Sequence, residues 1–168
     1  MTTPKIYVAC LASYNNGILH GDWIDVDENM DENIQEILEN STFSDAEEWA
    51  IHGYEGFGNI QIGENPDLEK LLEIADMISE DEDLATMCLE YHDGNIEEAK
   101  EMMENYRGCY KSLGDWKEEE MIGTGEDAQI PESVKGYIDY DRMAKDDELN
   151  GYVKTIRTGF EEVHVFSR

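Results

Sequence analysis

Oxygen-bearing side chains between residues 25 and 36 have the spacing of a calcium-binding loop. Asp, Asn and Glu stand at positions 1, 3, 5, 9 and 12 of this segment, as in an EF-hand. Met30, however, occupies the sixth position, where the sharp turn of that loop needs glycine, and Glu32 stands where an apolar residue normally packs. A strand rather than a helix is also expected before the segment. Calcium binding is therefore disfavoured.

The other groups capable of chemistry form no recognisable catalytic or metal-binding motif. The histidines lack the i, i+4 pair and the Cys/His spacing of metal sites, and the cysteines include no Cys-x-x-Cys pair. No phosphate-binding loop, dinucleotide-binding turn or nucleophile elbow occurs in the sequence. We therefore expect no catalytic residue, no metal and no cofactor. The residues considered are His20, His52, His92, His164, Cys10, Cys88 and Cys109.

Negative charge is the dominant feature of the composition. The 168 residues include 41 Asp and Glu against 12 Lys and Arg, which gives a formal net charge of -29 at pH 7. Self-repulsion at such a charge destabilises a compact state, so the excess calls for a functional reason. Because 40% of the residues are hydrophobic and 10% are aromatic, we expect a folded protein rather than a disordered acidic tail.

The charge is unevenly distributed along the chain. Residues 1–99 contain 25 acids and 2 bases, a net charge of -23, whereas residues 100–168 contain 16 acids and 10 bases, a net charge of -6. A strongly acidic surface repels its own copy. If the chain self-associates, we therefore expect the carboxy-terminal part to make the contact.

The size of the charge suggests an imitation of DNA. Duplex DNA carries one charge per about 1.7 Å of axis, so 29 negative charges correspond to about 50 Å of duplex. A globular chain of this length is about 40 Å across. We interpret the acids as a mimic of the phosphate surface that blocks a DNA-binding enzyme. The acids expected to form it are Asp25, Asp27, Glu28, Asp31, Glu32, Glu36, Glu39, Asp45, Glu47, Glu48, Asp76, Glu80, Asp81, Glu82 and Asp83.

Alternation and turn residues predict an α+β module at the amino terminus. Residues 5–11 and 18–26 have the pattern of two strands, and Asn16-Gly17 supplies the residues of a type I′ turn between them. Helical spacing of apolar residues follows over residues 31–40, and residues 48–54 can add a further strand.

The middle and end of the chain predict a helical module and a second α+β module. Asn65 and Pro66 predict the start of a first amphipathic helix. A second helix is expected to have an apolar face that includes Tyr91. Asn95 with Glu98 predicts a capping box at the start of a third helix. Beyond a strand at 107–111, helices are expected at 113–121 and 134–140, and a closing hairpin at 152–157 and 161–166 turns through Thr158-Gly159. The predicted modules are 1–62, 63–106 and 107–168, with short antiparallel sheets.

Three blocks of residues follow one another along the chain: the first covers residues 14–17 and 21–23, the second residues 50–57, and the third residues 131–140 and 149–152. Together they resemble the ArdA family of antirestriction proteins. Each block is modestly specific, but their order and separation match the family over nearly the whole chain. Lys145-Asp146-Asp147 departs from the family's tendency to place an apolar residue after Arg-Asp. The matching positions, which we expect to be structural, include Tyr14, Asn15, Gly17, Gly21, Trp23, His52, Tyr54, Glu55, Phe57, Pro131, Tyr137, Asp139, Tyr140 and Gly151.

The resemblance implies an elongated chain that dimerises through its carboxy-terminal module into a curved DNA mimic. It also implies the partner, the DNA-recognition and methyltransferase core of type I restriction-modification enzymes, whose occupation protects incoming mobile DNA. It further implies that no reaction is catalysed and that no nucleic acid is bound directly. An acidic protein-interaction or chaperone-like module that binds basic proteins is the main alternative, and an enzyme is a more distant one.

The sequence also bears on where the protein acts. The amino terminus has no apolar run of signal-peptide length, and no apolar stretch approaches the length of a membrane span. An odd number of widely separated cysteines fits reduced thiols. We therefore expect a soluble, cytoplasmic protein.

Overall fold

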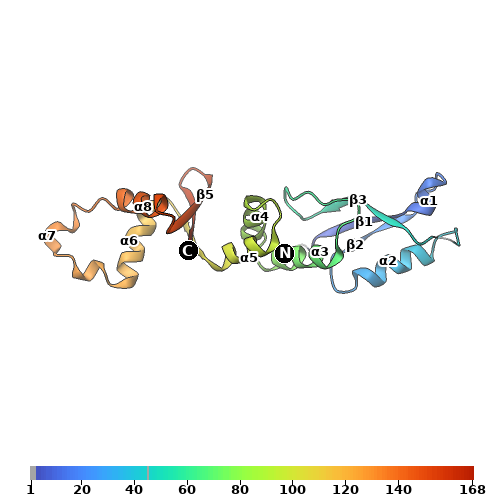
Figure 1. Cartoon of the computed structure of the whole chain (residues 1–168), viewed down its shortest axis with the longest axis horizontal. Helices are drawn as coiled ribbons and strands as arrows, with labels where there is room; N and C mark the ends of the chain where they lie inside the picture. Colours follow the sequence, from blue (N-terminus) through green and yellow to red (C-terminus); the bar gives the residue numbers. More distant parts are fainter. Residues whose placement is uncertain (1–2, 45) are drawn as a thin grey trace. The chain divides into compact units, whose positions relative to one another are not determined.

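The computed structural model describes residues 3–44 and 46–168. Contacts divide the chain into two compact units, Met1–Glu101 and Met102–Arg168. Both units combine helices with short antiparallel strands, which confirms the predicted α+β class (Figure 1). The division into three modules stays a prediction. Among the described residues, no helix has the length and apolar content needed to cross a membrane.

The amino-terminal unit is built on a three-stranded antiparallel sheet. Its strands are β1 (Lys5–Cys10), β2 (Gly21–Asp25) and β3 (Trp49–Glu55), in the order β2-β1-β3. Alternation places Ile6 and Val8 of β1 in the core, where both are fully buried. Ala9 and Cys10 are buried as well, so the end of this strand is covered on both faces.

The connection between β1 and β2 differs from the predicted two-residue turn. A short helix, α1 (Leu11–Asn15), follows β1 directly. A type I′ turn needs positive φ at both central residues, but Asn16 has a φ of -95° and only Gly17, at +76°, is left-handed. Ser13 of α1 is buried, and its hydroxyl lies 3.0 Å from that of Ser41, so a side-chain contact from a distant segment stabilises the longer connection.

The helix α2 (Met30–Glu39) lies against β1 and β2, as Figure 1 shows. Met30, Ile34 and Leu38 follow one another at helical spacing and are buried. The predicted amphipathic helix at residues 31–40 is thus confirmed, with its acids on the side away from the sheet.

Three further helices have starts that carboxylate or amide side chains stabilise. α3 (Leu68–Glu80) begins after Asp67, whose carboxylate accepts the amides of Glu69 and Lys70, so the cap lies two residues beyond the predicted Asn65. The helix starts at Leu68, so the Asp67 carboxylate rather than the Asn65 amide is in place to accept these orphan amides. The next helices are α4 (Glu82–Tyr91), capped by Asp81, and α5 (Ile96–Glu104).

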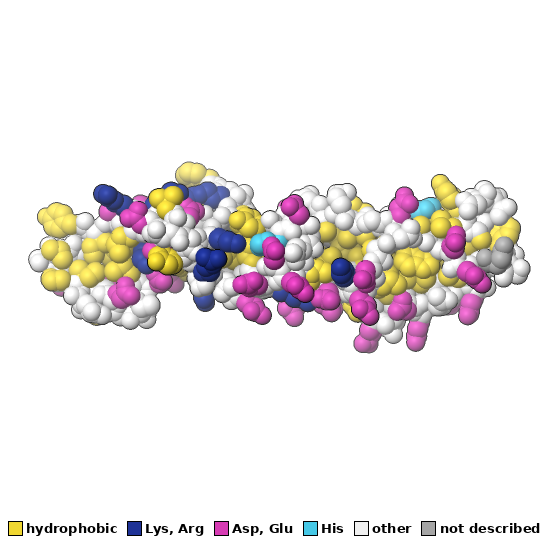
Figure 2. Space-filling view, in the orientation of Figure 1, with side chains coloured by type: hydrophobic (Ala, Val, Ile, Leu, Met, Phe, Trp, Pro, Cys, Tyr) yellow, Lys and Arg dark blue, Asp and Glu magenta, His cyan; other side chains and the backbone are white. Residues whose placement is uncertain are grey.

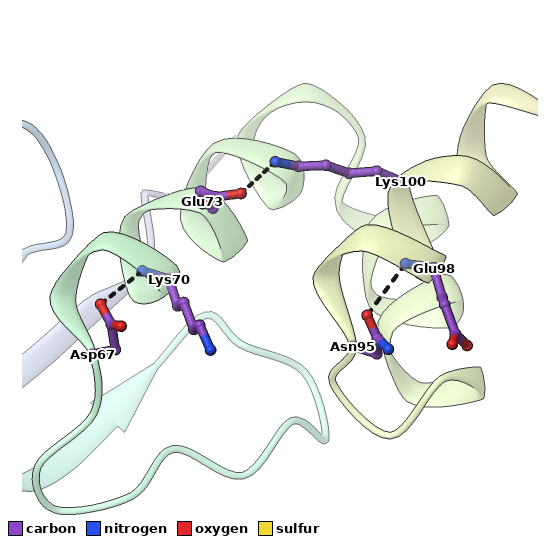
Figure 3. Close-up of polar contacts among 6 residues, drawn as sticks. All are labelled: Asp67, Lys70, Glu73, Asn95, Glu98 and Lys100. Carbon is purple, nitrogen blue, oxygen red and sulfur yellow. Dashed lines mark hydrogen bonds and ion pairs between the residues drawn. The ribbon is translucent and has the colours of Figure 1, made fainter.

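The predicted capping box at α5 is half formed. Asn95 accepts the amide of Glu98 at 3.3 Å, as Figure 3 shows. The Glu98 carboxylate does not return to Asn95 but accepts from the His92 ring at 2.7 Å. Tyr91, predicted to be on an apolar face, is 49% exposed because it ends α4 at the surface.

The carboxy-terminal unit holds a second three-stranded antiparallel sheet. Its strands are β4 (Tyr106–Tyr110), β5 (Val153–Gly159) and β6 (Glu162–Ser167), in the order β4-β6-β5. The predicted closing hairpin is confirmed, but its loop is Phe160-Glu161 rather than Thr158-Gly159. Glu161 has a φ of +59°, so the loop does not depend on glycine.

Helices pack on this second sheet through an apolar core. They are α6 (Leu113–Thr124), the 3-10 turn η1 (Asp127–Gln129), α7 (Glu132–Lys135) and α8 (Tyr140–Leu149). The predicted helix at 134–140 is wrong, because Asp139 accepts the amide of Arg142 and so starts a new helix. The core cluster comprises Leu113, Trp116, Ala144, Val153, Val163 and Val165.

One ion-pair network joins α6 to α8. Lys117 lies 2.8 Å from Asp147 and 2.6 Å from Glu120. Burial lowers the pKa of Lys117, but hydrogen bonds to these two carboxylates outweigh it, so the pKa is raised. The charged Asp147, which stands where the resembling family tends to have an apolar residue, therefore has a partner of opposite charge.

We predict that Gly21→Ala destabilises the amino-terminal unit. A Cβ at Gly21 would lie 2.3 Å from the carbonyl oxygen of Val8, a backbone atom that cannot move aside. We expect the free energy of unfolding, measured in urea, to fall by about 2 kcal/mol or more. Gly63→Ala is the control, because a Cβ there meets nothing within 4 Å. Equal stability of the two variants would contradict the close approach at Gly21.

Candidate functional site

The predicted acids of the DNA-mimic surface lie on the outside of the amino-terminal unit. We call the described members the acidic surface. All are exposed except Asp27, which is half-buried, and Asp45 lies outside the described residues. Figure 2 shows acidic side chains along the lower edge of this unit, over α2 and α3. The acidic surface comprises Asp25, Asp27, Glu28, Asp31, Glu32, Glu36, Glu39, Glu47, Glu48, Asp76, Glu80, Asp81, Glu82 and Asp83.

A row of carboxylates follows the exposed side of α2. Glu28 precedes the helix, and Glu32, Glu36 and Glu39 continue at intervals of four, four and three residues. Glu32, Glu36 and Glu39, which lie within the helix, are neighbours on one face, about 5–6 Å apart at Cβ. Since the opposite face of α2 packs on the sheet, the row is fixed in place by the core.

A second row follows α3 and was only half recognised in the sequence. Glu69, Glu73, Asp76 and Glu80 are spaced by four, three and four residues, and all are exposed. The sequence prediction included Asp76 and Glu80 but missed Glu69 and Glu73. The helical interval itself is the signal that would have found them, because it places them on the same face.

Few of these carboxylates are neutralised by a base. Among the described residues, Asp25 is the one member of the acidic surface in an ion pair, 3.3 Å from the Lys5 ammonium. In the second row, Lys100 lies 2.5 Å from Glu73, as Figure 3 shows. The amino-terminal unit, with 26 acids and 3 bases over residues 1–101, therefore keeps a net charge of -23.

Some acids also stabilise the helices that carry them. The Asp81 carboxylate accepts the amide of Leu84, and Asp27 accepts the amide of Asn29 at 2.8 Å. Asp31 and Glu82 lie in first helical turns, where the helix dipole favours negative charge. These placements lower the cost of concentrating so many like charges on one unit.

The calcium-like segment does not form a loop. Asp25 ends β2, and the segment from Met30 to Glu36 lies within α2, so its oxygen donors are spread over a strand end, a turn and a helix. Among residues 3–44 and 46–168, no group of three or more His, Cys, Asp or Glu side chains is arranged to hold a metal ion.

The histidines are each engaged by a neighbouring group. His20 Nε2 lies 2.6 Å from the carbonyl oxygen of Ile37, and a cavity of about 270 Å³ beside it is lined by polar and apolar residues of β2 and α2. The other partners are Tyr14 for His52, Glu98 for His92, and Tyr106 with Thr158 for His164.

The first two family-like blocks come together in space. The Tyr14 ring meets the His52 ring edge to face at 4.8 Å, and Phe57 is buried with its ring 6.0 Å from that of Tyr54. A Cβ at Gly53 would lie 3.2 Å from Trp23. Of the remaining positions, Asn15 ends α1, Gly17 is left-handed, Gly21 begins β2 and Glu55 ends β3.

The third block lies in the carboxy-terminal unit. Pro131 precedes α7, Asp139 caps α8, and Tyr137 between them is 88% exposed. Tyr140 begins α8, and the left-handed Gly151, with a φ of +75°, ends its last turn. This block does not share a unit with the acidic surface.

We predict that Glu36→Gln stabilises the protein. Glu36 is repelled by Glu32 and Glu39 in its row and lies near the negative end of the α2 dipole. Unfolding in urea at low salt should show a gain of about 0.5–1 kcal/mol, which disappears at about 1 M salt. Glu73→Gln is the control and should show no gain, because it removes the ion pair with Lys100. If both variants gained stability, loss of any one negative charge would explain the gain, and repulsion within the α2 row would not be needed.

Comparison with known protein families gives one match. The model of the family described as antirestriction protein (ArdA) matches residues 6–162. A comparison with curated proteins finds no match.

Proposed function

The chain belongs to the ArdA family of antirestriction proteins, and we propose that it acts as a DNA mimic in the DNA-binding groove of a type I restriction-modification enzyme. The partner in this proposal is the enzyme's DNA-recognition and methyltransferase core. Incoming mobile DNA then escapes cleavage because its binding site is occupied. The inhibitor itself catalyses no reaction.

The two carboxylate rows are the observation that supports this proposal most directly. The row from Glu69 to Glu80 spans 11 residue steps on α3, which is about 16 Å of helix. In the other row Glu32, Glu36 and Glu39 lie on α2, and Glu28 lies in the turn before it. The two rows thus present three and four charges at near-regular intervals on packed helices. Such an array can take the place of phosphates without being ordered first.

The mechanism is competitive and electrostatic. A basic groove gains affinity for DNA largely by pairing its Lys and Arg side chains with phosphates and releasing counterions. Carboxylates held in fixed rows offer the same pairing, and a cleft lined by one sign of charge also speeds the encounter. Because no base has to be read, the proposal requires neither nucleobase-like groups nor a catalytic centre.

We predict that inhibition depends on whole rows rather than on single acids. Exposed ion pairs each contribute about 0.5 kcal/mol, so one Glu→Gln change in the α2 row should weaken inhibition by less than about threefold. Changing Glu28, Glu32, Glu36 and Glu39 together should remove about 2 kcal/mol, or about thirtyfold. A matched control changes Glu118, Glu119, Glu126 and Glu161 of the carboxy-terminal unit, which removes the same net charge.

The measurement is displacement of a labelled DNA duplex from a purified type I methyltransferase core across a salt series. The unmodified protein should displace DNA at low salt and do so less effectively as salt rises. Failure to displace DNA at low salt would overturn the proposed function. Equal loss in the two fourfold variants would show that only net charge matters, and a single indispensable carboxylate would favour a catalytic or metal site. Equal binding to unrelated basic proteins would favour the chaperone-like alternative.

Dimerisation through the carboxy-terminal unit is the second part of the proposal. This unit carries 15 acids and 9 bases over residues 102–168, a net charge of only -6. It exposes large apolar side chains, with Leu149 at 74% and Tyr152 at 64%, around the turn that ends α8. The low charge favours self-association here over the amino-terminal unit, and the exposed apolar side chains offer a surface for it.

We predict that Leu149→Asp combined with Tyr152→Asp yields monomers. The added carboxylates would have to be buried without partners in a contact between copies. Sedimentation velocity should show a dimer for the unmodified protein and a monomer for the double variant. Leu19→Asp, at a side chain 84% exposed in the amino-terminal unit, should leave the dimer intact. A dimer that survives the double variant would place the contact elsewhere.

A further inference from the structure

The face of the amino-terminal sheet opposite its buried side chains carries an aromatic pair. Ile6, Val8 and Ile24 are buried on one face, so the intervening Tyr7 and Trp23 point to the other. These two residues are register partners on β1 and β2, and their rings meet edge to face with centroids 5.7 Å apart.

The third strand places a second aromatic pair next to the first in the chain. Gly53 is the register partner of Tyr7 on β3, and a Cβ there would lie 3.2 Å from the Trp23 ring. The indole can pack here because Gly53 has no side chain. A register shift between Tyr7 and Val8 adds a residue to β3 at this point, and the exposed His52 contacts the Tyr14 ring. The aromatic patch consists of Tyr7, Tyr14, Trp23 and His52.

The patch is exposed well beyond what packing of the sheet requires. Trp23 is 43% exposed and Tyr14 is 51% exposed, whereas the core of the unit is closed beneath them. Figure 2 shows apolar side chains at the surface of this unit close to acidic ones. Half-exposed Trp and Tyr rings grouped in this way are typical of contact surfaces, where such residues contribute most of the binding energy.

The charges around the patch restrict what can cover it. Asp25 and Glu55 flank the patch as the two register partners of Lys5, and Asp22 is exposed beside Trp23 on β2. Lys5 is the sole base before Lys70 in the sequence and pairs with Asp25. Nucleic acid would be repelled by this surface. An arginine side chain fits, because its guanidinium packs on aromatic rings while its N–H groups donate to carboxylates.

We propose that the aromatic patch receives arginine side chains from the DNA-binding groove of the target enzyme. This inference rests on the proposed function and adds to it a contact of different physical character. The carboxylate rows supply attraction that salt weakens. Rings that pack against guanidinium groups supply an apolar component of binding that salt weakens far less.

The first test is the double variant Tyr14→Leu with Trp23→Leu in the DNA-displacement measurement. We expect about a tenfold loss of inhibition at both low and high salt, with the slope of log affinity against log salt unchanged, because no charge is removed. The matched control is Tyr91→Leu, at a tyrosine 49% exposed in the same unit but outside the patch. Unfolding in urea verifies that each variant is folded, and Tyr14→Leu alone replaces the double variant if it is not.

The second test needs no enzyme and uses two peptides of equal charge, octa-arginine and octa-lysine. Titration calorimetry should show tighter binding of octa-arginine to the unmodified protein, by about threefold or more. That preference should shrink in the double variant and persist in the Tyr91→Leu control. An unchanged preference in the double variant would overturn the inference.

The outcomes separate this inference from the proposed function. If the unmodified protein does not displace DNA, the proposed function fails, and with it the assignment to that enzyme. If it displaces DNA but the folded double variant inhibits equally well, only the aromatic patch loses its role. A change of oligomeric state in the double variant, seen by sedimentation, would mean that a second copy covers the patch and would also overturn the inference.

Discussion

Repulsion between carboxylates is the constraint that the rest of the structure has to satisfy. A net charge of -23 on the amino-terminal unit opposes folding, and few bases are present to offset it. Burial of apolar side chains beneath the acids offsets this repulsion, and some of the acids also stabilise helices by capping them. Ile34 and Leu38 bury the inner face of α2 while Glu32 and Glu36 occupy its outer face. The scaffold and the charge therefore depend on the same helices.

Local patterns in the sequence predicted much of this scaffold. Apolar spacing located α2, α3 and the closing hairpin because each has one buried face, and periodicity reports burial directly. Connections were predicted less well. The β1–β2 connection holds a short helix because Ser13 bonds to Ser41, a contact between segments far apart in sequence. The start of α8 at Asp139 likewise depends on a cap that competes with an adjacent apolar pattern.

The acidic surface shows a similar division. Charge counting found where acids are concentrated along the chain but could not show which acids share a helix face, so Glu69 and Glu73 were not included. The aromatic patch was beyond sequence reasoning altogether. It exists because an extra residue in β3 brings His52 to the Tyr14 ring, and because Gly53 leaves room for Trp23. The His52–Tyr14 contact and the position of Trp23 beside Gly53 both depend on strand register, which a single sequence does not reveal.

The placement of the acids on outward helix faces also bears on how such a protein can diverge. The carboxylates of the α2 row are exposed, so exchanging Asp for Glu there should disturb the fold little. Gly21 and Gly53 have no such freedom, since any side chain there meets backbone or an indole ring. The charged surface can therefore change with little effect on the scaffold, whereas the positions of these glycines are constrained by it.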